Sequence, residues 1–254
     1  MNIPQELIDK IIDGVWHSDD SPTHSTTRAA SLISRSWVER SQHHLFHDIE
    51  FSFFGPYFAR WCDAVSPDPD GVSRHVRSLT IQARDEDGWW IGQETLERNL
   101  HFFDSFRNVQ ILRVRDWDVD PFPPEMLTRC FTSFAGSVRV LQWDPYMNTP
   151  HEPWTRIVGL LPLIDCLLLR PTSFPTGLLS NTPASPTRKK LILSSFCVTQ
   201  LLAWSECNIW FREIYIRCST GTVPQTFISI INGNADWLEV LSIASARKGQ
   251  TFFT

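Results

Sequence analysis

Val76-Arg77-Ser78-Leu79-Thr80-Ile81 is a short phrase with apolar residues at its first, fourth and sixth positions, and the chain repeats this pattern. Further copies begin at Val109, Val138, Ile164, Phe211 and Leu238, and a weaker one surrounds Leu191, with Arg188 at its first position. The fourth positions are residues 79, 112, 141, 167, 191, 214 and 241, so successive copies lie 23 to 33 residues apart. Repeats of this length are typical of stacked supersecondary units, in which each unit buries its apolar face against its neighbours.

The phrases alternate with segments of helical pattern. We expect strands over 76–82, 110–115, 139–143, 166–170, 190–194, 213–217 and 239–243, and helices over 94–106, 124–134, 152–161 and 224–232. Such alternation predicts parallel strands, and the short fixed period favours a curved α/β solenoid of about seven repeats over a doubly wound sheet. Only Phe252 and Phe253 follow the last phrase closely as large apolar residues, so we expect an open, poorly protected edge there.

Composition excludes several classes of function. A net charge of −5 and a pI near 5.9 give no basic surface for nucleic acid. No apolar run is long enough to span a membrane, and the N-terminus lacks the pattern of a signal peptide, so we expect a cytoplasmic or nuclear protein without a membrane partner. Six cysteines without a CxxC pair are therefore expected to be free thiols.

Catalytic and metal-binding motifs are missing from the sequence. There is no GxSxG, Gly-rich phosphate loop, HExxH or Rossmann fingerprint, so we expect neither an enzyme nor a cofactor. His43, His44 and His47 have the spacing of one helix face, but no Cys or acidic residue stands at ligand spacing. We expect structural or surface histidines there, and no metal site.

The N-terminal residues predict a group of helices. Over 3–15, Ile3, Leu7, Ile8, Ile11, Ile12 and Val15 fall on one helix face, and Pro4 suits the first turn. Two further helices are expected over 25–37 and 38–46. The aromatic stretch 51–62 is ambiguous, and a strand over 51–53 is one reading of it.

Two stretches of this region resemble the F-box family. They are Ile3-Pro4-Gln5-Glu6-Leu7-Ile8-Asp9-Lys10-Ile11-Ile12, which is similar to the opening (L/I)PxELxxxI(I/L), and Leu32-Ile33-Ser34-Arg35-Ser36-Trp37, which is similar to the closing LVSRxW. The repeats over 75–245 are similar to leucine-rich repeats that lack the consensus Asn. Between the two F-box stretches this chain is longer and more polar than is usual in the family. The resemblance implies a fold that is α+β overall: a three-helix F-box domain at 1–50, a linker at 51–74, and a leucine-rich-repeat-like solenoid with parallel strands at 75–254.

The resemblance also implies a function and its residues. An F-box protein of this type is the substrate-recognition subunit of an SCF-type ubiquitin ligase, in which the F-box binds the Skp adaptor of a cullin complex and the repeats bind the target. We expect the adaptor-binding residues to be Pro4, Leu7, Ile8, Ile11, Leu32 and Ser34, and the F-box core to contain Ile12, Ile33 and Trp37. The alternative is a non-catalytic scaffold whose N-terminal helices only cap the solenoid.

The variable positions of the strand phrases should share the concave face, because side chains alternate along a strand. The candidate target-binding residues on this face are Arg113, Arg115, Gln142, Arg170, Tyr215 and Arg217. A row containing four arginines predicts recognition of an acidic or phosphorylated segment of the target. The alternative is a solvated polar face that binds no ligand.

Overall fold

The repeated phrase forms the strands of a single sheet. The computed structural model describes residues 3–18, 25–52, 62, 71–82, 97–98, 100–115, 124–144, 157, 159–169, 190–195, 211–218, 228, 231–232, 235–236, 238–245 and 251–253. Within them the sheet runs in chain order through β1 (Asp48–Ser52), β2 (Ser78–Gln82), β3 (Ile111–Arg115), β4 (Val140–Asp144), β5 (Cys166–Leu169), β6 (Lys190–Ser195), β7 (Glu213–Cys218), β8 (Val240–Ser245) and β9 (Thr251–Phe253).

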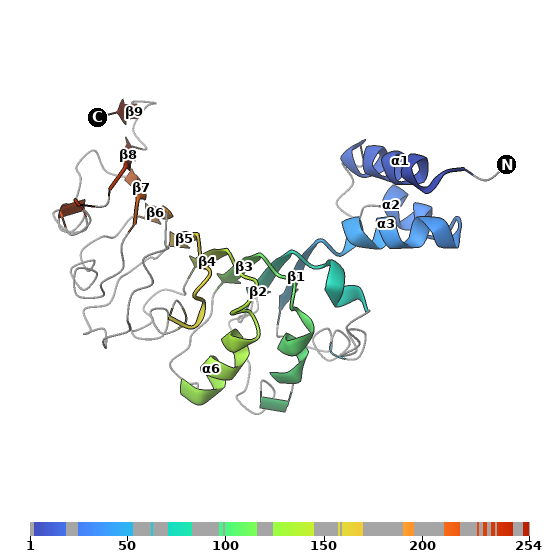
Figure 1. Ribbon diagram of the computed structural model, residues 1–254, viewed down its shortest axis with the longest axis horizontal. Coiled ribbons are helices and arrows are strands. Elements are labelled where there is room, and N and C mark those ends of the chain that lie inside the picture. Colours follow the sequence, from blue (N-terminus) through green and yellow to red (C-terminus); the bar gives the residue numbers. More distant parts are fainter. Residues whose placement is uncertain are drawn as a thin grey trace.

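The first eight strands are all parallel, which confirms the expected pairing. The connections carry η1 (Val72–His75), η2 (Leu100–Ser105) and α6 (Pro124–Thr132). The strands follow an arc, and η2 and α6 lie on its outer side (Figure 1). The fold is therefore mixed α/β, with η2 and α6 on the outer face of the sheet and the other face on the inside of the arc.

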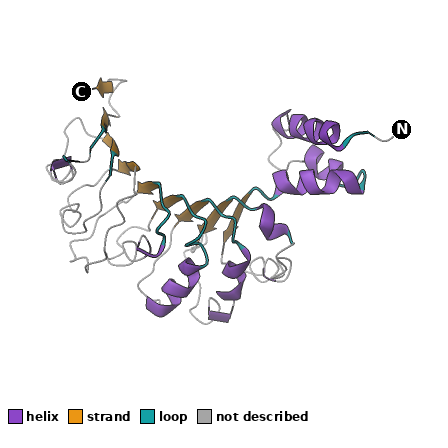
Figure 2. Cartoon of the chain, viewed as in Figure 1, coloured by secondary structure: helices purple, strands orange, loops and turns teal. Residues whose placement is uncertain are grey.

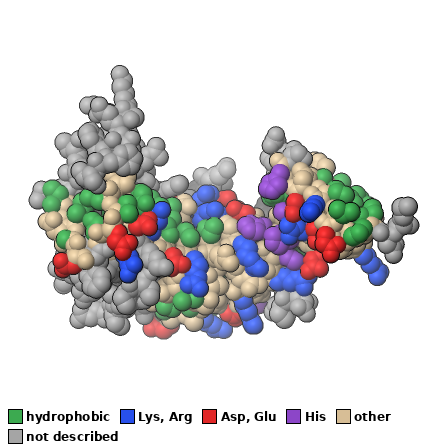
Figure 3. Space-filling model, turned by 45° about the horizontal axis from the view of Figure 1, so that its top comes forward, with side chains coloured by type: hydrophobic (Ala, Val, Ile, Leu, Met, Phe, Trp, Pro, Cys, Tyr) green, Lys and Arg blue, Asp and Glu red, His purple; other side chains and the backbone are tan. Residues whose placement is uncertain are grey.

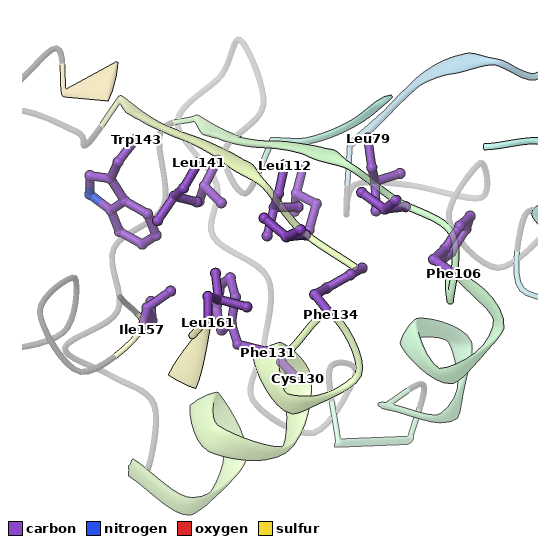
Figure 4. Packing of buried hydrophobic residues seen from close by; sticks show 14 of the residues in the cluster. Leu79, Phe106, Leu112, Cys130, Phe131, Phe134, Leu141, Trp143, Ile157 and Leu161 are labelled. Atoms are coloured by element: carbon purple, nitrogen blue, oxygen red, sulfur yellow. The ribbon is translucent and has the colours of Figure 1, made fainter. Parts of the chain in front are cut away.

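The phrase positions explain which face is covered. Leu79, Leu112, Leu141 and Leu167 lie side by side in the parallel register and have no exposed surface. Figure 4 shows Leu79, Leu112 and Leu141 directed from the strands toward phenylalanines of the helical layer. Phe102 and Phe106 meet edge to face there, with 4.9 Å between ring centroids. Burial of each such side chain stabilises the fold by about 1.5–3 kcal/mol relative to exposure.

One strand was anticipated only in part, by the reading of 51–53 as a strand, and another was not predicted. β1 lies where a linker was expected to begin, and its alternation of Asp48, Ile49, Glu50 and Phe51 buries only the two apolar residues. β9 pairs antiparallel with β8 and brings Phe252 beside Ile243, so the edge of β8 is covered where an open edge was expected. β9 has three residues, which gives little room for a periodic pattern to stand out, whereas β1 is as long as β2.

Three helices precede the sheet: α1 (Gln5–Ser18), α2 (Ser25–Ala30) and α3 (Arg35–Leu45), which we call the head (Figure 2). The helix expected over 25–37 is interrupted by a turn at 31–34. The interruption occurs because Ser34 has extended backbone angles, φ −160° and ψ 164°, and stands at the N-cap of α3. Serine favours this position over a helix interior. Within the described residues, no helix is long and apolar enough to cross a lipid bilayer.

Candidate functional site

Large apolar side chains are exposed on the head. Leu7 and Ile11 are four positions apart on one side of α1, and Ile3 precedes the helix; Ile3, Leu7 and Ile11 are 55%, 51% and 46% exposed. Leu32 and Ile33, in the turn before α3, are 85% and 64% exposed. We call these five residues the apolar head surface, and Figure 3 shows hydrophobic side chains gathered on the head. Among the described residues, the other exposed large hydrophobic side chains are those of Ile228 and Val240.

A hydrogen bond connects the two parts of this surface. The Nε2 atom of Gln5, in the first turn of α1, donates to the backbone oxygen of Ser36 at 2.9 Å. Ser36 follows directly on the turn that carries Leu32 and Ile33, and its hydroxyl oxygen lies 2.8 Å from that of Ser34. The start of α1 and the start of α3 are therefore held together, and the apolar side chains of both border the same part of the head.

The adjoining part of the apolar side of α1 faces the interior, and the burial of the head corrects two expectations. Ile8 is 5% exposed and Ile12 is fully buried, so both belong to the core of the head, although Ile8 was expected at the adaptor surface. Ile33 was expected in the core but is exposed, because it lies in the turn and no helix directs its side chain inward. Trp37 is half-buried. Pro4 and Ser34, two expected adaptor residues, are exposed together with Leu7, Ile11 and Leu32.

An ion-pair cluster fixes α1 against α3. Arg40 donates from Nε and Nη2 to the two oxygens of Asp13 at 2.7 and 2.8 Å, and the Nε2 atom of His44 lies 2.6 Å from Asp13 Oδ1. The hydrogen bond from Arg40 is the main reason that the pKa of Asp13 falls to about 2. Trp16 stacks on His44 with 5.3 Å between ring centroids. The exposed side of α1 is therefore presented on a helix whose position is fixed.

The concave face carries the arginines that were expected to bind the target, but two of them already have partners. Arg113 Nη1 lies 3.2 Å from both carboxylate oxygens of Asp48 and also donates to the Ser78 hydroxyl. Arg115 Nη1 lies 3.3 Å from Glu50 Oε1. Both arginines reach across β2 to β1, so each is paired with a carboxylate of its own chain.

The other expected target-binding residues lie apart from this cluster. Gln142 is on β4 and only 8% exposed. Tyr215, on β7, donates from its hydroxyl to Glu213 at 3.2 Å, and Lys190 Nζ lies 4.3 Å from the centroid of its ring. The backbone of Arg217 lies farther along β7, beside Ser194 of β6. Arg170 lies outside the described residues. The structure therefore places these residues in two groups, near β3–β4 and on β7.

Histidines meet where the head joins the sheet. The ring of His43 lies 5.4 to 6.1 Å from the rings of His44, His47 and His75, measured between centroids. Burial lowers the pKa of His43 and of His75, and the neighbouring Arg40 and Arg74 respectively lower it further. Arg74 Nε donates to Nε2 of His75 at 3.1 Å. In the part of the chain that the structure describes, no group of His, Cys, Asp or Glu side chains is arranged to hold a metal ion.

Sequence reasoning did not identify Ile3 as part of the apolar head surface. It also did not identify Asp48 and Glu50 as partners of Arg113 and Arg115. The acidic pair had a visible signal in the alternation of β1, which places both carboxylates on the concave face. Comparison with known proteins adds no assignment: no protein-family model matches this chain, and no curated protein has a significantly similar sequence.

Proposed function

We propose that this chain is the substrate-recognition subunit of an SCF-type cullin–RING ubiquitin ligase. In this proposal the head is an F-box that binds the Skp adaptor, and the parallel sheet with its outer helices is a leucine-rich-repeat-like solenoid that binds the target protein. The observation that carries the proposal is the apolar head surface. Leu7, Ile11 and Leu32 belong to it and are also positions of the F-box resemblance.

The energetics favour a partner on this surface. Burial of a large aliphatic side chain contributes about 1.5–3 kcal/mol, and a few such side chains dominate the affinity of many protein interfaces. Contiguous apolar surface rimmed by polar residues marks interaction sites. The rim here includes Gln5, Ser34 and Ser36, which already hydrogen-bond to one another or to the backbone and therefore lose little on being covered.

The scaffold alternative has less support. A head that only capped the sheet would bury its apolar side chains against the first strands, whereas the five residues of the apolar head surface are exposed. The function would be carried out by tethering: the target and the ubiquitin-charged enzyme are held in one assembly, so their encounter becomes intramolecular and gains effective concentration. In this mechanism the chain contributes binding surfaces and no catalytic group.

Adaptor binding tests the proposal. Purified Skp adaptor is titrated into the full chain, into Leu7→Ala/Ile11→Ala/Leu32→Ala, and into the matched control Ile228→Ala/Val240→Ala, which removes exposed aliphatic side chains outside the head. We expect the wild type and the control to bind equally and the triple variant to bind at least about a hundredfold more weakly. Failure of the folded wild type to bind adaptor, or equal binding by all three, would overturn the proposal.

A further inference from the structure

Four apolar side chains lie next to one another on the concave face. They are Val140 of β4, Cys166 and Leu168 of β5, and Ile192 of β6. Val140 is the register neighbour of Cys166, and Leu168 is the register neighbour of Ile192. We call these four residues the apolar strip. Their sequence neighbours Leu141, Leu167 and Leu191 are fully buried on the other face, so the strip faces away from the core.

The strip is an unusual feature of a parallel sheet. Parallel sheets are normally covered on both faces, and exposed sheet faces are normally polar. Here α6 and η2 lie on the outer side, and none of the described helices lies over β4, β5 and β6 on the concave side (Figure 1). All four side chains of the strip are half-buried, as expected for side chains that are flanked by neighbouring strands. Ile111 and the ring of Tyr215 extend the apolar surface to either side.

Among the side chains that the structure describes, charged groups on both sides of the strip are paired within the chain. On one side Arg113 pairs with Asp48, and Arg115 pairs with Glu50. On the other side Lys190 lies 3.7 Å from a carboxylate oxygen of Glu213. A phosphate group that approached either arginine would meet a carboxylate at almost the same distance, so attraction and repulsion largely cancel. The surface therefore favours an uncharged ligand over an acidic one.

Shape restricts the ligand further. The sheet curves so that the head and the C-terminal strands rise on the same side, with the strip between them (Figure 1). A second copy of this face is concave too, and two concave faces cannot meet at their centres. A flat lipid surface is excluded for the same reason. A protruding or extended polypeptide segment can reach the strip, and the strip's span across three strands, about 10 Å between the outer strands, accommodates a few of its side chains.

We propose that the concave face binds an unphosphorylated protein segment through apolar side chains that pack on Val140, Cys166, Leu168 and Ile192. This inference specifies the target class within the proposed function and rests on it for its biological meaning. It replaces the expectation of an acidic or phosphorylated segment, because Arg113 and Arg115, the arginines of this face whose side chains the structure describes, are paired with Asp48 and Glu50.

The experiment uses short random peptides displayed on phage and selected on the full chain. Enriched sequences are synthesised unmodified, and where they contain serine or threonine also in phosphorylated form. Binding is measured to the wild type, to Leu168→Thr/Ile192→Thr and to Arg113→Gln/Arg115→Gln. Threonine is compatible with a strand, so the first variant removes apolar surface with little change in strand propensity. A thermal melt of each variant establishes that it is folded, and Leu168→Ala/Ile192→Ala replaces the threonine variant if that variant is not.

We expect the enriched peptides to be rich in apolar residues and to lose at least about tenfold in affinity on the strip variant while binding the arginine variant normally. Enriched peptides that are acidic or need phosphate, that depend on the arginines, or that bind the folded strip variant unchanged would overturn the inference, as would the absence of any enriched peptide. The Skp titration is repeated with the same proteins. If the wild type binds the peptides as expected but does not bind the adaptor, the ligase proposal alone is refuted. If the wild type binds the adaptor but the peptide results are not as expected, this inference alone is refuted.

Discussion

Arg113 Nη1 lies 3.2 Å from both carboxylate oxygens of Asp48, although the two residues are 65 positions apart and a whole strand separates them. The arginine crosses β2 to make this contact, and Arg115 does the same to reach Glu50. Ser78 and Thr80, which lie on β2 beneath these side chains, are each only 2% exposed. Charged residues of the concave face on β1 and β3 are therefore occupied with one another.

The Arg113–Asp48 pair is expected to contribute little, but measurably, to stability. Asp48 is 57% exposed, so solvent screens the pair, and a double-mutant cycle with Arg113→Gln and Asp48→Asn should give a coupling energy of about 0.5–1 kcal/mol. Urea unfolding of the four proteins measures it, and concentrated salt should reduce it. A coupling energy indistinguishable from zero at low salt would contradict the pairing.

Truncation of two neighbouring isoleucines of α1 should affect stability to very different extents. Ile12 is fully buried, so Ile12→Ala should lower the free energy of unfolding by about 2–4 kcal/mol through lost burial and a cavity. Ile11 is 46% exposed, and Ile11→Ala should change stability by no more than about 0.5 kcal/mol while weakening adaptor binding. Urea unfolding and the Skp titration separate the two effects. Equal destabilisation by both substitutions would contradict the burial of Ile12 and the exposure of Ile11.

The stability of the junction between head and sheet should fall in mild acid. The pKa values of His43 and His75 in the folded chain lie below the ordinary value of 6.5, so between those values and 6.5 the unfolded chain binds more protons. The contribution of these two histidines to the free energy of unfolding should therefore decrease as the pH falls through this window. Above pH 6.5 their contribution should be constant. Protonation of His75 would also remove the acceptor that Arg74 uses.

Urea unfolding across this pH range measures the effect. We expect His43→Gln/His75→Gln to flatten the dependence, and His101→Gln, at an exposed histidine, to leave it unchanged. A double variant that keeps the full pH dependence of the wild type would show that other groups are responsible.

The thiol of Cys130 should be inert in the folded chain. The side chain is 1% exposed, and burial raises its pKa to about 12, so very little thiolate exists at neutral pH. Labelling with N-ethylmaleimide followed by peptide mapping should modify Cys130 only after addition of denaturant, and later than the half-buried Cys62. Rapid labelling of Cys130 in the native protein would contradict its position beneath the sheet.

Much of the sheet is predictable because its pattern is local. All seven phrase strands lie within two residues of their expected bounds, since an apolar residue at the fourth and sixth positions is needed in every unit that packs on the same core. The helical layer between the strands is less predictable: the helix expected over 94–106 contains the 3-10 turn η2 at Leu100–Ser105. Phe102 and Phe103 of η2 are nevertheless buried, because their side chains point toward the sheet although the segment is a 3-10 helix and not an α-helix.

By itself the sequence determined the parallel strands, the apolar ladder through Leu79, Leu112 and Leu141, and an apolar face on the first helix, because these follow from periodicity within a few residues of chain. Only the tertiary structure decided that Ile8 and Ile12 are buried while Leu7 and Ile11 are exposed, since all four share one broad apolar side of α1 and the position of α3 selects which part is covered. It also decided that Arg113 pairs with Asp48, because that contact joins strands brought together by the sheet and has no local signature in the chain.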